Sequence, residues 1–313
     1  MAVLSPGGAA TPPSGPAPRR VLLVSRDDEL DSLLAGRRIA AHLGELERAE
    51  DGGGTGEGGP PPDVALVCDD DAATRRLLDL GVPVVRLCSG HRATGAPLAA
   101  EAEGALLRVH RPGWLPGPWP ATPGGARTTG VLAPARMTRG RRRSGTLLLL
   151  SLWGAPAGDT EAFTSDALRQ IAAEAVRRTQ RCQVVCDTGV ERVRAALEGM
   201  DGVRVLRAAD TDVDALHAGT ELLLASPTLG AVALAQARRA PLAFLPPLGD
   251  AQRDLADRVA RAAPVPVAAD PRAPTLWGPE RPDPWSALDG AADDLRGAQR
   301  VARTLRQLSL APL

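Results

Sequence analysis

The sequence has few aromatic residues and no excess of charge of either sign. It contains no Tyr and no Lys, and only two Phe among its 313 residues. So few rings leave little on which nucleic-acid bases could stack. The 37 basic and 37 acidic residues balance, so the electrostatic footprint of a nucleic-acid-binding protein is missing as well. We therefore expect no nucleic acid among the partners.

Long apolar runs and paired cysteines are also missing. A membrane-spanning helix needs about 18 or more consecutive apolar residues, and since the sequence has no such run we expect no membrane span. The four cysteines stand in or beside predicted strands, without the spacing or the nearby His of a metal site. We expect no metal, and buried free thiols favour a cytoplasmic protein. The cysteines are Cys68, Cys88, Cys182 and Cys186.

The length and the apolar pattern together predict two α/β domains. A chain of 313 residues is longer than one typical core supports. Short apolar runs alternate with helical stretches over 20–110 and again over 146–260, which is typical of doubly wound parallel sheets of the Rossmann-like kind. We expect a disordered tail at 1–19, an N-terminal domain at 20–135, a linker at 136–145, a C-terminal domain at 146–287, and a last helix at 288–313 that packs back on the body.

The stretch 221–257 carries the clearest signal of a binding site. An apolar run at 222–225 predicts a buried strand, and the turn at 226–230 leads into an Ala-rich helix that ends near Arg239. The free backbone amides at the start of such a helix can face an anion such as a diphosphate. Most strand–turn–helix units bind nothing, so a purely structural turn is the alternative that the spacing leaves open.

The same stretch resembles a known family. Its motifs look like the donor-binding half of GT-B glycosyltransferases, and most of all like the cytosylglucuronate (CGA) synthases, which join cytosine to glucuronic acid from a UDP-sugar. The resemblance covers roughly the second half of the chain and implies a GT-B architecture, in which two Rossmann-like domains face a cleft. The residues that carry it are Ser226, Pro227, Leu229, Ala240-Pro241, Leu245-Pro246-Pro247 and Gln252.

The resemblance also implies a reaction and a set of donor contacts. The N-terminal domain would lie on the acceptor side and the C-terminal domain would bind a UDP-sugar as co-substrate, with no tightly bound cofactor. The sugar, implied to be glucuronic acid, would pass to a small nucleobase-like acceptor by inverting displacement, while backbone amides stabilise the leaving diphosphate. The implied donor-binding residues are Ser151, Trp153, Gly154, Ser226, Thr228, Leu229, Gly230 and Gln252.

A transferase needs a base for its acceptor, and three residues are candidates. Asp27 and Asp28 follow the first predicted strand, although acids there also serve as the cap or first turn of a helix, which we favour. His91 follows the strand predicted at 82–87, at the edge where ligands lie in an open α/β sheet. The acidic run at 69–71 suggests a metal site or a helix start, and without a second acidic cluster we favour the helix start.

Two departures from the family pattern keep a second function open. Leu234 stands where the family has an acidic residue that binds the donor ribose, and losing such a bond costs about 1.5–3 kcal/mol. The turn at 26–29 contains neither the Gly nor the His of the relatives. The alternative is a degenerate, non-catalytic GT-B homologue that binds a nucleotide or supports a partner protein. An oxidoreductase or epimerase of similar shape is disfavoured because the first turn lacks GxGxxG.

Overall fold

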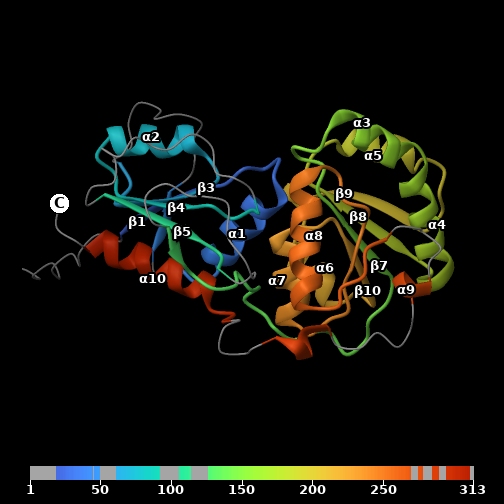
Figure 1. Ribbon diagram of the computed structural model, residues 1–313. Helices are drawn as coiled ribbons and strands as arrows, with labels where there is room; N and C mark the ends of the chain where they lie inside the picture. Colours follow the sequence, from blue (N-terminus) through green and yellow to red (C-terminus); the bar gives the residue numbers. More distant parts are fainter. Residues whose placement is uncertain are drawn as a thin grey trace, which may run out of the picture.

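The computed structural model describes residues 19–44, 46–49, 61–91, 106–113, 126–268, 274–277, 284–288 and 294–310. These residues form two parallel sheets with helices on their faces, which confirms the predicted α/β fold class (Figure 1). The tail predicted at 1–19 lies outside the described residues except for Arg19. None of the described helices is both long and apolar enough to cross a bilayer.

The first sheet has six strands in the order β2-β1-β3-β4-β5-β6, all paired in parallel. Helix α2 (Asp71–Asp79) covers one face of it, while α10 (Gly297–Leu310) and part of α1 (Leu30–Ala40) pack on the other. The helix predicted at the end of the chain thus begins at Gly297 instead of 288. The strands are β1 (Arg20–Val24), β2 (Glu47–Ala49), β3 (Val64–Cys68), β4 (Val84–Leu87), β5 (Leu107–Arg111) and β6 (Arg127–Thr128).

The second sheet has five parallel strands in the order β11-β10-β7-β8-β9. β7, β10 and β11 read as apolar runs because helices cover both faces of the sheet, whereas the edge strand β9 alternates valine and leucine with exposed arginines. The strands are β7 (Thr146–Leu150), β8 (Cys182–Cys186), β9 (Val203–Arg207), β10 (Leu222–Ala225) and β11 (Ala243–Phe244). The helices are α3 (Ala157–Ala162), a π-helical turn η2 (Phe163–Ala167), α4 (Leu168–Thr179), α5 (Val190–Ala196), η3 (Ala208–Asp210), α6 (Val213–Ala218), α7 (Leu229–Ala237), α8 (Asp250–Ala262), α9 (Pro274–Trp277) and η4 (Pro284–Ala287).

Each sheet begins at an inner strand, which creates a point where the connections reverse direction. In the second sheet β7 leads to β8 on one side, whereas β10, on the other side of β7, leads away to β11. In the first sheet the same reversal lies between β1 and β3. Ligands of open α/β sheets bind outside the carboxyl ends of the strands at such points. The fold therefore places a candidate site where β7 and β10 end.

Helix α1 lies between the two sheets and contacts both (Figure 1). Its residues Leu30, Leu33 and Leu34 share an apolar cluster with side chains of α7 and the second sheet. Ala35 and Ile39 face the cluster that α10 forms with the first sheet. Each sheet and the helices that cover it form one unit of the chain. Because α1 is buried on nearly all sides, it joins these two units through apolar contacts.

Candidate functional site

The ends of β7 and β10 are joined by side chains that the sequence predicted as donor contacts. The Ser151 amide donates to the Ser226 hydroxyl over 3.0 Å. The Gln252 side chain donates to the Ser151 carbonyl over 2.9 Å and accepts from the Leu248 amide over 2.9 Å. Residues that lie a hundred positions apart in the sequence therefore form one buried network at the predicted edge.

The turn after β10 presents two backbone amides to a carboxylate. Thr228 is the N-cap of α7, and its hydroxyl accepts from the Ala231 amide over 3.3 Å. The first amides of a helix have no partner within it. Here the Leu229 and Gly230 amides donate to the carboxylate of Asp31 on α1, over 3.2 and 2.6 Å. The N-terminus of α7 therefore binds a carboxylate in this structure, and this carboxylate belongs to the chain itself.

Burial removes the Asp31 carboxylate from water and so disfavours its charged form. Burial raises the pKa of its carboxyl to about 6, and the nearby Asp69 carboxylate also raises this pKa. The Gly230 and Leu229 amides and the Arg38 guanidinium lower the pKa, but they do not outweigh burial. The ionised form is thus more costly in the folded protein than in water. The sequence analysis considered Asp27 and Asp28 at this helix start, as cap residues or as bases, and it missed the contact of Asp31.

Asp187 is a second carboxylate of the site that the sequence prediction did not include. It follows β8 directly and accepts from the Ser151 hydroxyl at 2.7 Å and from the Leu152 amide at 2.9 Å. The same carboxylate accepts from the Leu30 amide at 3.3 Å and so binds the first turn of α1. Burial raises the pKa of Asp187, although its hydrogen bonds oppose this. An acid directly after a buried strand was the available sequence signal.

His91 lies beside the same network and is paired with an acid. Its Nε2 lies 2.5 Å from the Asp254 carboxylate on α8, which also accepts from Arg258 at 2.9 Å. Burial lowers the pKa of His91, while Asp254 raises it. A small cavity of about 30 Å³ lies beside these groups. It is lined by Glu29, Asp31, Gly90, His91, Ser151, Pro227, Thr228, Ala251, Gln252 and Leu255.

The other two candidate bases make different contacts. Asp27 is well exposed and lies 3.9 Å from Arg207. Asp28 binds the Arg26 guanidinium through both of its oxygens, which lowers the pKa of this carboxyl. Helix α1 begins after them, with Glu29 of the same acidic run as its N-cap residue, so the run does precede a helix start as we favoured, but Asp27 and Asp28 themselves lie outside the cap and the first turn. The acid in its first turn is Asp31.

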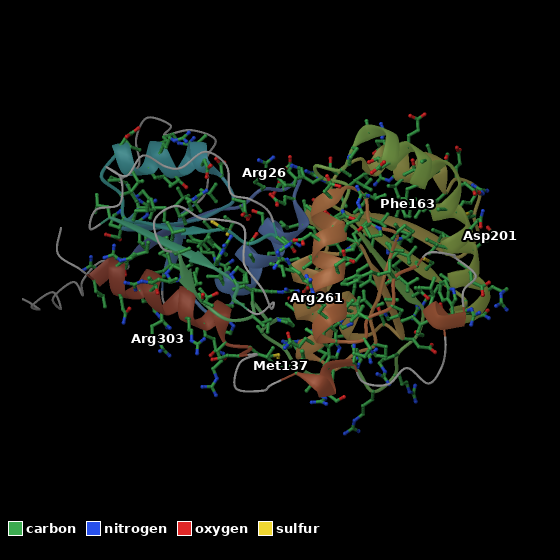
Figure 2. The ribbon with its side chains drawn as sticks, in the orientation of Figure 1. Arg26, Met137, Phe163, Asp201, Arg261 and Arg303 are labelled. Carbon is green, nitrogen blue, oxygen red and sulfur yellow. The ribbon has the colours of Figure 1, made fainter. Side chains whose placement is uncertain are left out.

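The remaining predicted positions serve turns and contacts between the two units. The Arg26 guanidinium lies 4.8 Å from the centroid of the Trp153 ring. Figure 2 shows Arg26 where the two units meet. Gly154 adopts a φ of 64°, a left-handed conformation that favours glycine. In the acidic run, Asp70 caps α2 through the Ala73 amide at 2.8 Å. Among the described residues no cluster of three or more His, Cys, Asp or Glu could hold a metal ion.

Two arginines of α1 fasten it to the second sheet. Arg38 binds Asp214 on α6 through two hydrogen bonds of 3.1 and 2.8 Å, and also donates to the Leu132 and Gly230 carbonyls. Arg37 donates to three backbone carbonyls within 208–211, after β9. Leu234 is fully buried in the apolar cluster around α1 and α7.

Comparison with known proteins agrees with this architecture. The family described as "CGA synthase-related protein" matches residues 21–313. The structure of Arabidopsis thaliana UGT89C1 complexed with UDP-L-rhamnose is 9% identical, with a TM-score of 0.51, over 93% of this chain and 99% of that chain. Acinetobacter baumannii MurG is 11% identical, with a TM-score of 0.44, over 93% and 100% of the two chains. No match was found among curated proteins. The predicted GT-B architecture is confirmed.

Proposed function

We propose, since this chain belongs to the CGA synthase-related protein family, that it transfers a sugar from a UDP-sugar to a small nucleobase-like acceptor. One observation carries the proposal: the Leu229 and Gly230 amides, at the reversal point of the second sheet, hold a carboxylate. A diphosphate offers the same kind of acceptor oxygens with more negative charge, and the head of a helix favours both. We take glucuronic acid as the sugar from the resemblance to the cytosylglucuronate synthases.

The proposed chemistry is inverting displacement at the end of β10. The amides at the head of α7 would stabilise the charge that develops on the leaving diphosphate, without a tightly bound metal. Ser151, Trp153, Gly154, Ser226, Thr228 and Gln252 are the further donor contacts that we propose. The four cysteines, which are free and buried, fit the cytoplasmic location that we propose for the protein.

We propose His91 as the base that takes the acceptor proton. It lines the same cavity as Ser151, Thr228 and Gln252, whereas Asp27 and Asp28 make contacts elsewhere. Asp254 would orient the imidazole and stabilise the imidazolium that forms, which is the usual task of a carboxylate beside a catalytic histidine. Proton removal from the acceptor oxygen or nitrogen then accompanies its attack on the sugar carbon.

A second function is favoured by the way α1 fills the site. The cavity of about 30 Å³ cannot hold a UDP-sugar, and Leu234 offers no charge to a ribose. If α1 never leaves this place, the protein is a non-catalytic homologue that supports a partner protein. The two functions therefore differ in whether α1 can move.

Transfer itself distinguishes the two functions. We expect the purified protein to release UDP from UDP-glucuronate when cytosine is present, and much less without it, as followed by chromatography. The exposed variant Asp79→Ala on α2 serves as a control and should behave like the wild type. A folded protein that releases no UDP from UDP-glucuronate, UDP-glucose or UDP-N-acetylglucosamine, with cytosine or related bases as acceptors, would support the non-catalytic function.

A further inference from the structure

Helix α1 lies across the carboxyl ends of three strands of the second sheet. Its first amide, on Leu30, binds Asp187 after β8. Its Arg37 guanidinium binds backbone carbonyls after β9, and its Asp31 carboxylate binds backbone amides after β10. Ligands of open parallel sheets bind outside these strand ends. A segment of the first unit therefore occupies the ligand position of the second, with an anion placed on amides and a cation placed on carbonyls.

The contact between α1 and α7 leaves no space for another anion. A Cβ added to Gly230 would lie 2.8 Å from Leu34 Cδ1 and 2.9 Å from Asp31 Oδ1, closer than real Cβ atoms come. The absence of a side chain at Gly230 thus lets α1 approach the head of α7. The Leu229 and Gly230 amides each already donate to one oxygen of Asp31. A phosphate group can therefore bind these amides only after Asp31 and α1 have moved.

Burying an acidic side chain at position 31 lowers the stability of the folded protein, and packing of α1 does not require it. The neighbours Leu30, Leu33 and Leu34 seat α1 in an apolar cluster and require no charge. Burying a carboxylate beside them adds desolvation, as the raised pKa of Asp31 indicates. An acid satisfies the two amides in the closed protein, yet it is easier to release than a well-packed apolar side chain because water and ligand compete for it. This combination suits a contact that must open.

We propose that Asp31 is an internal anion that occupies the diphosphate site and keeps it closed, so that a nucleoside diphosphate binds only by displacing Asp31 together with α1. The inference rests on the donor site of the proposed function. The apparent dissociation constant is then the intrinsic constant divided by the fraction of open protein. Any change that weakens the closed form raises the apparent affinity without touching the ligand.

The test compares the wild type with Asp31→Ala and Asp31→Asn. Removing the carboxylate leaves the Leu229 and Gly230 amides unsatisfied in the closed form, which favours the open form. We expect Asp31→Ala to bind UDP and inorganic pyrophosphate about 10- to 100-fold more tightly than the wild type in calorimetric titration. Asp31→Asn keeps one acceptor oxygen and should fall in between, and Asp79→Ala should match the wild type.

Hydrogen exchange of the Leu229 and Gly230 amides, measured without ligand, gives a second readout. We expect both amides to exchange about 10- to 100-fold faster in Asp31→Ala than in the wild type, because each loses its acceptor. If the wild type binds UDP and Asp31→Ala binds it no more tightly, the inference is overturned while the donor site stands. If no variant binds UDP or pyrophosphate, the proposed donor site and the inference that rests on it are both overturned.

Discussion

Replacing Arg38 with Ala should cost the protein about 3–5 kcal/mol of unfolding free energy. The Arg38 side chain is buried and holds the Asp214 carboxylate in two hydrogen bonds. Removing it leaves this carboxylate without its hydrogen bonds from Arg38 and takes the Arg38 donor away from the Leu132 and Gly230 carbonyls. The loss is this large because the Asp214 side chain is only 23% exposed, so its carboxylate cannot fully regain the hydration it had in the unfolded chain once Arg38 is gone. Urea unfolding of the two proteins measures the difference.

Two further variants make the Arg38 result specific. Arg75→Ala removes an exposed arginine of α2 and should stay within about 0.5 kcal/mol of the wild type. The double variant Arg38→Met with Asp214→Leu replaces both charges by apolar groups and should recover much of the loss. If Arg38→Ala alone costs less than about 1 kcal/mol, the value of an exposed ion pair, then this pair does not fasten α1 to the second sheet.

Replacing His91 with Ala should lower turnover about 10²- to 10⁴-fold, the usual effect of losing a general base. Binding of UDP should stay unchanged, because His91 is proposed to take the acceptor proton and not to bind the donor. Asp254→Asn removes the charge that stabilises the imidazolium and should lower turnover by a smaller factor. The measurement is the rate of UDP release at saturating UDP-glucuronate and cytosine.

The matched control for His91 is His42, which follows α1 and lies away from the cavity. His42→Ala should keep the turnover of the wild type. A His91→Ala protein that keeps its turnover within about tenfold, the low end for losing a base, would show that another group takes the proton. Since Asp28 is held by Arg26, the exposed Asp27 would then be the next residue to replace.

The sequence predicts those strands whose apolar pattern is visible within a short stretch of the chain. The strand at 222–225 was expected with the bounds that the structure shows, because a buried parallel strand reads as a short apolar run. β2 (Glu47–Ala49) and β5 (Leu107–Arg111) were not predicted. β2 is a polar three-residue edge strand, and β5 mixes apolar with basic residues, so neither has the pattern of a buried strand.

The site could be predicted only where it follows from strand ends. Ser151 and Ser226 each follow a buried strand of the same sheet, so their meeting at one edge was foreseeable. The contact of Asp31 was not, because its partners Leu229 and Gly230 lie 198 and 199 residues further along the chain. In the sequence Asp31 is an ordinary acid in the first turn of a helix. Only the packing of α1 between the two sheets reveals what it binds.

Calorimetric titration of the wild-type protein with UDP, and then with UDP-glucuronate, decides whether the crevice at the ends of β7 and β10 is a nucleotide-sugar site. We expect saturable binding of both ligands, with dissociation constants in the micromolar range, through the amides at the N-terminus of α7. We also expect UDP to protect the Leu229 and Gly230 amides from hydrogen exchange once α1 has left them. If neither the wild type nor the Asp31→Ala variant binds UDP or UDP-glucuronate, this crevice is not a nucleotide-sugar site.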